Sequence, residues 1–298
     1  MDVADAPELI GRGDYLVNHV VGCVLCHSPR DWTYFSGPVK PGEEGAGGAI
    51  YDESNGFPGH LRAGNITPEA LGEWSDGEVA HSIVAGVNAS GDSLFPVMPY
   101  PYFRSLCRED LQAIVAYIRG LSGKPVSAHQ RRLNFPLNMI VNFIPKPWEN
   151  PQCPDASNEL AYGKYLVDLS FCASCHTPRD GGHMDKDRLF AGGREFSVPG
   201  VDGVVRSSNL TSHETGLGAW SRQRFVRHFK AFDQAEFLAK PLPIGSFNSP
   251  MPWHSYGGLS EADLGAIYAY LMTLQPIENR VEVWSRPGGD VGTTGKKP

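Results

Sequence analysis

Apolar residues recur at helical spacing near the ends of two long stretches of the chain. One set is Leu111, Ile114, Val115 and Ile118, and the other is Leu264, Ile267, Tyr268 and Leu271. The i, i+3, i+4, i+7 spacing predicts a helix packed on one face at each place. Earlier helices are predicted to begin near Ser75, with the acidic Glu78 close behind this cap, and at Ser221. Strands have little support in the pattern, so a mainly α fold with long loops is expected.

The stretches around these helices repeat in the same order. The matched blocks are 13–17 with 163–167, 28–31 with 177–180, 62–67 with 206–211, 71–75 with 217–221, 98–100 with 251–253, and 111–118 with 264–271. Six ordered matches predict two copies of one domain. We expect domain one over 1–122, an interdomain linker over 123–158, domain two over 159–280 and a flexible C-terminal tail over 281–298.

The predicted linker is unusual because it is both proline-rich and apolar. A free linker would be polar, whereas this one carries Leu133, Phe135, Met139, Phe143 and Trp148. We expect it to pack across one or both domains, and the alternative is a docking surface for a partner subunit. The glycine-rich end from Pro287 onward is expected to be mobile.

Composition indicates the general class of protein but does not identify its chemistry. The chain has 298 residues, of which 41% are hydrophobic and 20% are charged, as in an ordinary globular protein. The formal net charge of −7 argues against nucleic acid as a partner. No apolar run approaches the roughly 20 residues that a membrane span needs.

Two short runs carry the chemistry: Cys23-Val24-Leu25-Cys26-His27 and Cys172-Ala173-Ser174-Cys175-His176. The C-x-x-C-H spacing lets two thiols bond the two vinyl groups of one haem, while the adjacent histidine binds the iron. We therefore expect two covalently bound haem c groups. They attach through Cys23 and Cys26 and through Cys172 and Cys175, with His27 and His176 as iron ligands. Zinc binding by the cysteine pairs is a weaker alternative, because each pair would need two further ligands.

The other iron ligand decides whether each haem passes electrons or activates a molecule. Met98 and Met251 lie in matched loops, each followed by proline and an aromatic residue, shortly before the final helix. We expect both to be iron ligands. The rival is bis-histidine ligation, for which the available residues are His60, His81, His129, His183, His213, His228 and His254. None of these occupies matched positions in both copies, and His254 is the nearest to Met251.

The haem surroundings are predicted from residues that recur in both copies. Arg62 and Arg206 are candidates to pair with haem propionates. Trp74 and Trp220 offer an indole N–H and a large apolar face. Asn65 and Asn209 are candidate haem-pocket residues that alternatively fix the loop backbone. The alternatives are solvated surface charge for the arginines and plain core packing for the tryptophans.

Cys107 and Cys153 remain outside the motifs. They are either free thiols or a disulfide, because haem c is attached in the oxidising bacterial periplasm.

These motifs resemble class I cytochrome c domains in the cytochrome c subunits of bacterial periplasmic dehydrogenases of the alcohol and gluconate type. The resemblance covers about 8–122 and 159–276. It implies two tandem class I cytochrome c domains, each a few helices wrapped around one covalent haem, with His27/Met98 and His176/Met251 ligation. Such subunits usually carry three haem domains and a membrane anchor, whereas two domains are expected here. Diheme subunits of molybdenum-containing dehydrogenases are also similar.

The expected function is electron transfer without substrate chemistry of its own. A periplasmic dehydrogenase would be the donor and a cytochrome or oxidase the acceptor, with association to a membrane complex. The location would be periplasmic, with the export leader already removed. The competing hypothesis is a diheme redox enzyme, of the peroxidase or thiosulfate-oxidising type, in which one haem ligand is labile.

Overall fold

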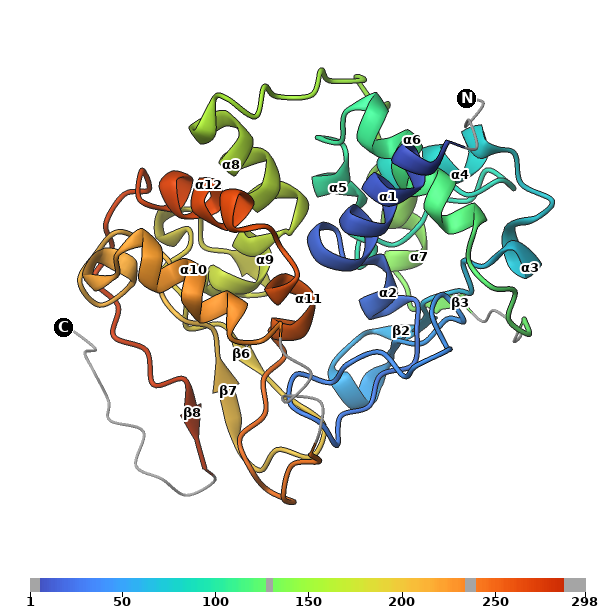
Figure 1. Cartoon of the computed structure of the whole chain (residues 1–298). Helices are drawn as coiled ribbons and strands as arrows, with labels where there is room; N and C mark the ends of the chain where they lie inside the picture. Colours follow the sequence, from blue (N-terminus) through green and yellow to red (C-terminus); the bar gives the residue numbers. More distant parts are fainter. Residues whose placement is uncertain (1–5, 127–130, 234–239, 287–298) are drawn as a thin grey trace.

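The computed structural model describes residues 6–126, 131–233 and 240–286, where long loops connect helices and a smaller number of short strands. Figure 1 shows the helices of the first repeat on one side of the molecule and those of the second repeat on the other. The first-repeat helices are α1 (Pro7–Tyr15), the π-helix η1 (Leu16–Val20), α2 (Cys23–Cys26), η2 (Glu53–Asn55), α3 (Pro68–Leu71), α4 (Asp76–Ala85), α5 (Tyr100–Phe103) and α6 (Arg108–Arg119). The later helices are α7 (Leu137–Ile140), η3 (Val141–Phe143), α8 (Glu159–Leu169), α9 (Cys172–His176), η4 (Lys186–Arg188), η5 (Leu217–Ala219), α10 (Arg222–Lys230), α11 (Trp253–Gly257) and α12 (Glu261–Leu271). No helix in the described part of the chain combines the length and apolar character of a membrane span.

The helices predicted from the apolar pattern are confirmed. The four apolar residues predicted to face inward on α6 are all buried, and α12 buries Leu264, Ile267 and Leu271. The helix α4 begins with a capping box in which Ser75 accepts from the Glu78 N–H and Glu78 accepts from the Ser75 N–H at 2.7 Å. Such reciprocal bonds satisfy two N–H groups that would otherwise have no helical partner.

A glycine at the same place in both repeats lets two helices cross at close range. A Cβ on Gly13 would lie 2.0 Å from the Ala113 carbonyl oxygen, so α1 can contact α6 only without a side chain there. A Cβ on Gly163 would likewise lie 2.0 Å from the Ala266 oxygen, where α8 meets α12. The repeated glycine thus fixes the crossing of the first and last helices.

The π-helix η1 accounts for a length difference between the repeats. Ten positions separate Gly13 from Cys23, whereas nine separate Gly163 from Cys172. A π-turn accommodates one extra residue within a helix. The extra residue in the first repeat is therefore absorbed before the cysteine motif, and both motifs keep their own turn of helix.

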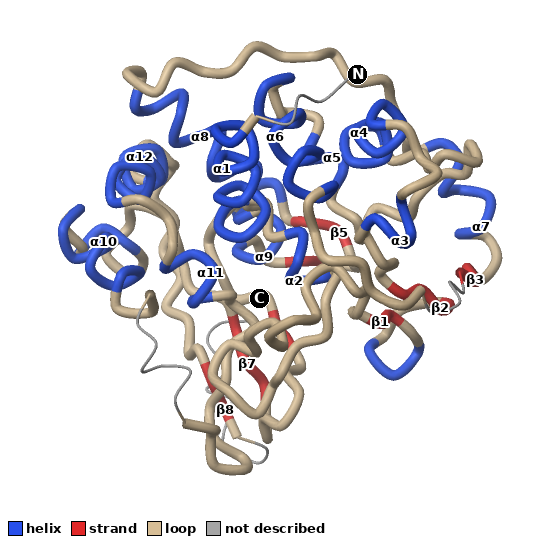
Figure 2. The backbone as a smooth tube through the Cα atoms, turned by 45° about the vertical axis from the view of Figure 1, so that its right-hand side comes forward, coloured by secondary structure: helices blue, strands red, loops and turns tan. Residues whose placement is uncertain are grey.

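Short antiparallel sheets close the lower part of each half, as Figure 2 shows. The strands are β1 (Ile50–Tyr51), β2 (Gly59–Arg62), β3 (Arg131–Leu133), β4 (Arg179–Asp180), β5 (His183–Met184), β6 (Glu195–Phe196), β7 (Val204–Arg206) and β8 (Trp284–Ser285). The two three-stranded sheets are ordered β1-β2-β3 and β6-β7-β8, with Ile50 opposite Arg62 and Glu195 opposite Arg206. The pattern did not predict these strands, because two to four residues are too few to show a period of two.

The two halves meet through a pair of equivalent tyrosines. The Tyr15 hydroxyl donates to Asp263 at 2.6 Å and accepts from the Ser260 N–H at 3.0 Å, at the start of α12. The Tyr165 hydroxyl donates to Asp110 at 2.8 Å, at the start of α6. Each repeat thus holds the first turn of the other repeat's final helix.

The predicted linker packs on the first repeat but leaves part of its apolar surface exposed. Val141 is fully buried, and the Trp148 indole donates to the Leu106 carbonyl at 3.0 Å. Phe135 and Phe143 are 79% and 84% exposed. The expected packing is therefore observed for part of this segment, and the alternative of a docking surface for a partner subunit stays a prediction. The predicted mobile end from residue 287 lies outside the described residues, as does His129.

Candidate functional site

Each cysteine motif forms one helical turn directly after a residue with positive φ. Gly22 (φ 64°) precedes α2, and Phe171 (φ 40°) precedes α9. Burial raises the pKa of Cys23 and of Cys172 to about 12 and also raises the pKa of Cys26 and Cys175. The two thiols of each motif share one turn of helix, which is the spacing that attachment to a single haem requires.

The remaining two cysteines behave differently from those of the motifs. Cys107 and Cys153 form a disulfide with a Cα–Cα distance of 4.9 Å, whereas the four motif cysteines are free thiols. The choice between free thiols and a disulfide is thereby settled for this pair. The bond joins the first residue before α6 to the segment that leads into the second repeat.

The two motif histidines are oriented by equivalent hydrogen bonds. The Nδ1 of His27 lies 2.7 Å from the Gly64 carbonyl oxygen, and the Nδ1 of His176 lies 2.8 Å from the Ser208 oxygen. A carbonyl can only accept, so each Nδ1 carries the proton and each Nε2 keeps the lone pair that binds a metal. Burial lowers the pKa of His176, which favours the neutral, metal-binding ring.

Asn65 and Asn209 hold the loops that supply those carbonyls. The Asn65 side-chain oxygen accepts from the N–H and hydroxyl of Thr67, both at 2.7 Å, and its amide donates to the Lys124 carbonyl at 2.9 Å. Asn209 makes the same bonds with Thr211 and donates to the Ile277 carbonyl at 2.8 Å. These contacts support the alternative in which the asparagines fix the backbone and so place the histidine partners.

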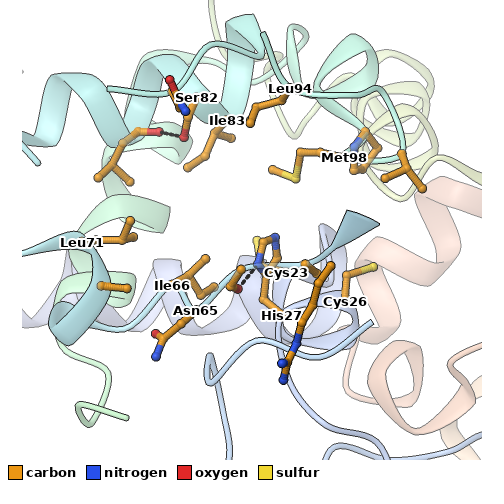
Figure 3. Close-up of a pocket in the computed structure, with 18 of the residues that line it drawn as sticks. Cys23, Cys26, His27, Asn65, Ile66, Leu71, Ser82, Ile83, Leu94 and Met98 are labelled. Atoms are coloured by element: carbon orange, nitrogen blue, oxygen red, sulfur yellow. Dashed lines mark hydrogen bonds between the residues drawn. The ribbon is translucent and has the colours of Figure 1, made fainter. Parts of the chain in front are cut away.

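A cavity of about 400 Å³ lies between the first motif and the Met98 loop. Figure 3 shows Met98 on one side of this space and Cys23 with His27 on the opposite side. Most of the wall is apolar and includes Leu71, Ile83 and Leu94. The volume and the lining are those of a small-molecule or cofactor pocket.

The arginines and tryptophans predicted for the haem surroundings differ between the repeats. Arg62 and Trp74 line the cavity, and the buried Arg62 Nε has no hydrogen-bond partner among the described residues. Arg206 instead pairs with Glu195 at 2.9 Å and donates to the Ser285 hydroxyl at 2.9 Å. Trp220 packs its ring against Arg224, whose guanidinium lies 4.3 Å from the ring centroid. The first-repeat pair therefore lines the cavity beside the first motif, whereas Arg206 and Trp220 are not part of its wall.

The first-repeat cavity fits a covalent haem by its chemistry. Two thiols and a histidine lie on one wall and a thioether on the opposite wall, while the buried Arg62 Nε lacks an acceptor that a propionate would supply. In the second repeat, Met251 lies in the matched loop between α10 and α11 and packs against the hydrophobic core. Cys172, Cys175, His176 and Met251 thus lie at places in the second repeat that correspond to those of Cys23, Cys26, His27 and Met98 in the first.

The histidine nearest to Met251 lies at the boundary between the repeats. The His254 Nδ1 is buried without a hydrogen-bond partner among the described residues. Its pKa is lowered to about 4 by burial first and then by the nearby Arg30 and His19. An uncharged ring is thus expected at this place, next to two basic residues of the other repeat.

The two motifs influence each other electrostatically across the boundary. Burial raises the pKa of Cys175, two arginines oppose the rise, and Cys26 of the other repeat adds to it. The pKa of the buried Tyr256 is raised well above its usual value, first by burial and then by Cys172, Cys175 and Cys26. Phe171, which directly precedes Cys172, lines the first-repeat cavity. Sequence reasoning missed Phe171, Tyr256 and the cavity-lining Arg131, because no motif marks a contact between repeats.

Comparisons with known proteins agree with the motifs. The chain is 30% identical over 285 residues to the cytochrome c subunit of a quinone alcohol dehydrogenase from Gluconacetobacter polyoxogenes, which covers 90% of this chain and 56% of that protein. It is 30% identical over 284 residues to the gluconate 2-dehydrogenase cytochrome c subunit of Pantoea cypripedii, covering 89% of this chain and 59% of the relative. It is 26% identical over 269 residues to a diheme cytochrome c-type protein of Cereibacter sphaeroides, covering 86% and 83%.

The chain spans little more than half the length of the first two relatives. No family model matches it. The predicted resemblance to dehydrogenase cytochrome c subunits is confirmed by these similarities.

Proposed function

We propose that this relative of dehydrogenase cytochrome c subunits carries two covalent haem c groups and passes electrons from a dehydrogenase to a downstream acceptor. The observation that carries the proposal is the pair of equivalent histidine contacts, His27 with Gly64 and His176 with Ser208. Both carbonyls lie in matched blocks, and a methionine loop follows each block at a matched position. These matched contacts support one haem site with the same kind of ligands in each repeat.

When bound, haem c supplies a one-electron iron couple. Cys23 and Cys26 would attach it in the first repeat, and Cys172 and Cys175 in the second. The carbonyls of Gly64 and Ser208 fix the orientation of the histidine rings through Nδ1, and Nε2 would be the nitrogen that binds the iron. Met98 and Met251 would close the other side, and a thioether ligand raises the reduction potential. A protein with both axial positions filled suits electron passage better than substrate activation.

Electrons would cross between the repeats where the two attachment turns meet. Burial is the main cause of the raised pKa values of Cys175 and Tyr256. Cys26 of the other motif raises the pKa of Cys175 further, and cysteines of both motifs raise that of Tyr256. Phe171 contacts the Phe103 ring with 6.4 Å between centroids, and both rings line the first cavity. Phe103 and Tyr256 are buried at 2% and 7% exposure, so part of the medium between the two sites is apolar protein interior.

The electron donor is proposed from the relatives, whose names identify subunits of alcohol, gluconate and fructose dehydrogenases. A dehydrogenase in the periplasm fits both those relatives and the need of haem c for export. The net charge of −7 predicts that partners present a basic surface. The acceptor would be a further cytochrome or an oxidase.

The proposal is tested by haem content and by an optical spectrum of the oxidised protein. We expect two covalent haems per chain and a sulfur-to-iron charge-transfer band from both. Met98→Ala and Met251→Ala should each remove about half of this band and lower the potential of one haem. Met139→Ala is the matched control, because Met139 is unmatched between repeats and 57% exposed.

Two results would contradict the proposal. A high-spin haem in the unsubstituted protein, or rapid peroxide turnover, would indicate the competing redox enzyme with a labile ligand. A single haem per chain would contradict the assignment of one complete site to each repeat. Loss of the whole band in either methionine variant would show that the sites are not independent.

A further inference from the structure

A loop of the first repeat, residues 31–37, reaches across to the second repeat, and we call it the crossing loop. The Thr33 carbonyl accepts from the Leu242 N–H at 2.7 Å. Phe35 stacks on Phe232 with 5.8 Å between ring centroids and lies 6.2 Å from Phe247. The crossing loop is thus docked beside the segment of the second repeat that contains Met251.

Ser36 occupies the centre of this contact and is only 1% exposed. Its hydroxyl donates to the Met251 carbonyl and accepts from the Trp253 N–H at 2.9 Å. Its own N–H donates to the Asn248 side-chain oxygen at 2.7 Å. One serine therefore binds the backbone on both sides of the Met251-Pro252 bond.

The conformation of Ser36 is maintained by residues on both sides of the boundary. Ser36 has φ 63°, a left-handed conformation that a residue other than glycine adopts only when its surroundings require it. Arg30 donates to the carbonyls of Ser36 and Gly37. The Asn248 amide donates to the carbonyls of Trp32 and Tyr34, each at 3.2 Å. These bonds fix the crossing loop and the Met251 loop relative to each other.

The Met98 loop of the first repeat is held differently. Among the described residues, the Met98 carbonyl accepts only from the Tyr100 N–H of its own repeat, at 2.8 Å. The equivalent bond from Trp253 to Met251 is also 2.8 Å, so the local turn is the same in both loops. The additional contact from Ser36 is present only at Met251.

We propose that Ser36 is a positioning residue for the Met251 ligand, so that iron ligation in the second repeat depends on the first repeat. The inference rests on the proposed function, because it takes Met251 as an iron ligand. A ligand on a loop needs support from a further layer of contacts to stay within bonding distance. Without the Ser36 hydroxyl, the Met251 carbonyl and the Trp253 N–H lose a buried partner, and the loop relaxes away from the iron.

The test uses the full chain with both haems attached, in backgrounds that isolate one sulfur ligand. In Met98→Ala protein the remaining sulfur-to-iron band belongs to Met251, and in Met251→Ala protein it belongs to Met98. Ser36→Gly removes the hydroxyl, and glycine accepts the positive φ without strain. Thr33→Ala is the matched control, since Thr33 lies exposed in the same loop and its hydroxyl bonds only Asp31.

We expect Ser36→Gly to remove most of the band and lower the haem potential in the Met98→Ala background, and to change neither in the Met251→Ala background. Thr33→Ala should change neither quantity in either background. Asn248→Asp, which keeps the acceptor for Ser36 but loses the two donated bonds, should weaken the band in the Met98→Ala background. If Ser36→Gly does not accumulate with both haems attached, Asn248→Asp is the variant that tests the positioning role.

Each other outcome has a definite meaning. An unchanged band for Ser36→Gly in the Met98→Ala background overturns the positioning role. An equal loss in both backgrounds also overturns it, because it would show general destabilisation. If Met98→Ala and Met251→Ala do not each remove part of the band in the presence of Ser36, the proposed ligation itself fails, and this failure is seen before Ser36 is changed.

Discussion

The tyrosine pair at the boundary between the repeats allows a stability prediction with a magnitude taken from its surroundings. Tyr165→Phe removes only the hydroxyl that donates to Asp110, and both residues are buried at 7% and 6% exposure. Tyr15→Phe removes the equivalent bond to Asp263, but that pair is only partly buried. Hydrogen bonds to charged groups contribute about 1.5–3 kcal/mol, with the larger cost where a charge stays buried with fewer donors.

We therefore expect Tyr165→Phe to lower the free energy of unfolding by about 2–3 kcal/mol. Two donors from Arg12 at 2.8 and 2.9 Å remain on Asp110 and limit the loss. Tyr15→Phe should cost about 1–1.5 kcal/mol, because water can replace the lost donor at a partly exposed carboxylate. The order of the two values follows from burial alone.

Equilibrium urea unfolding of the haem-loaded protein, followed by far-UV circular dichroism, measures both changes through the shift of the midpoint at constant slope. Tyr270→Phe is the matched control, since its hydroxyl has no hydrogen-bond partner among the described residues, and it should stay within about 0.5 kcal/mol of the unsubstituted protein. A larger cost for Tyr15→Phe than for Tyr165→Phe would refute the reasoning from burial. If Tyr165→Phe and Tyr15→Phe both changed the free energy of unfolding by less than the control does, these hydrogen bonds would not stabilise the boundary.

Three further predictions concern single groups. Arg62→Gln should lower the potential of one haem by about 59 mV, a tenfold change in a one-electron equilibrium, because a positive charge in the cavity wall is lost. Potentiometric titration should show no such shift for Arg206→Gln, whose charge is already paired with Glu195. Replacing Cys107 and Cys153 by serine opens a loop of sequence separation 46 and should cost about 4 kcal/mol by the chain-entropy relation, measured by urea unfolding against the disulfide-bonded parent. The pKa of His254 is lowered to about 4, so the unfolded chain binds more protons than the folded protein between about pH 6.5 and 4. The free energy of unfolding should therefore fall as the pH drops through this range, by at most about 3 kcal/mol. The fall should be smaller in His254→Gln, measured by urea unfolding at each pH.

Much of the architecture follows from local relations along the chain. The stripe on α6 and the serine caps of α4 and α10 involve residues within one or two turns of each other. The attachment motifs are equally local, since two thiols and a histidine within five positions must share one turn. The matched order of blocks then extends each local inference to the other repeat.

The differences between the repeats could not be read in the same way. Arg62 and Arg206 occupy matched positions, yet Arg62 lines a cavity while Arg206 pairs with Glu195. The short strands that bring Glu195 opposite Arg206 involve too few residues for a periodic signal. Matched positions therefore predicted the backbone of both sites better than the partners of their charged side chains.

The sequence by itself determined which cysteines are the candidates for haem attachment, which histidines and methionines are the candidate ligands, and that matched blocks recur in the same order. Only the tertiary structure decided how the repeats face each other: Tyr15 bonds Asp263, Phe171 lines the first-repeat cavity, and Ser36 bonds the Met251 loop. The physical reason is sequence separation. Spacing encodes contacts within a turn of helix, whereas a hydrogen bond between residues 215 positions apart, as from Ser36 to Met251, depends on the packing of both repeats.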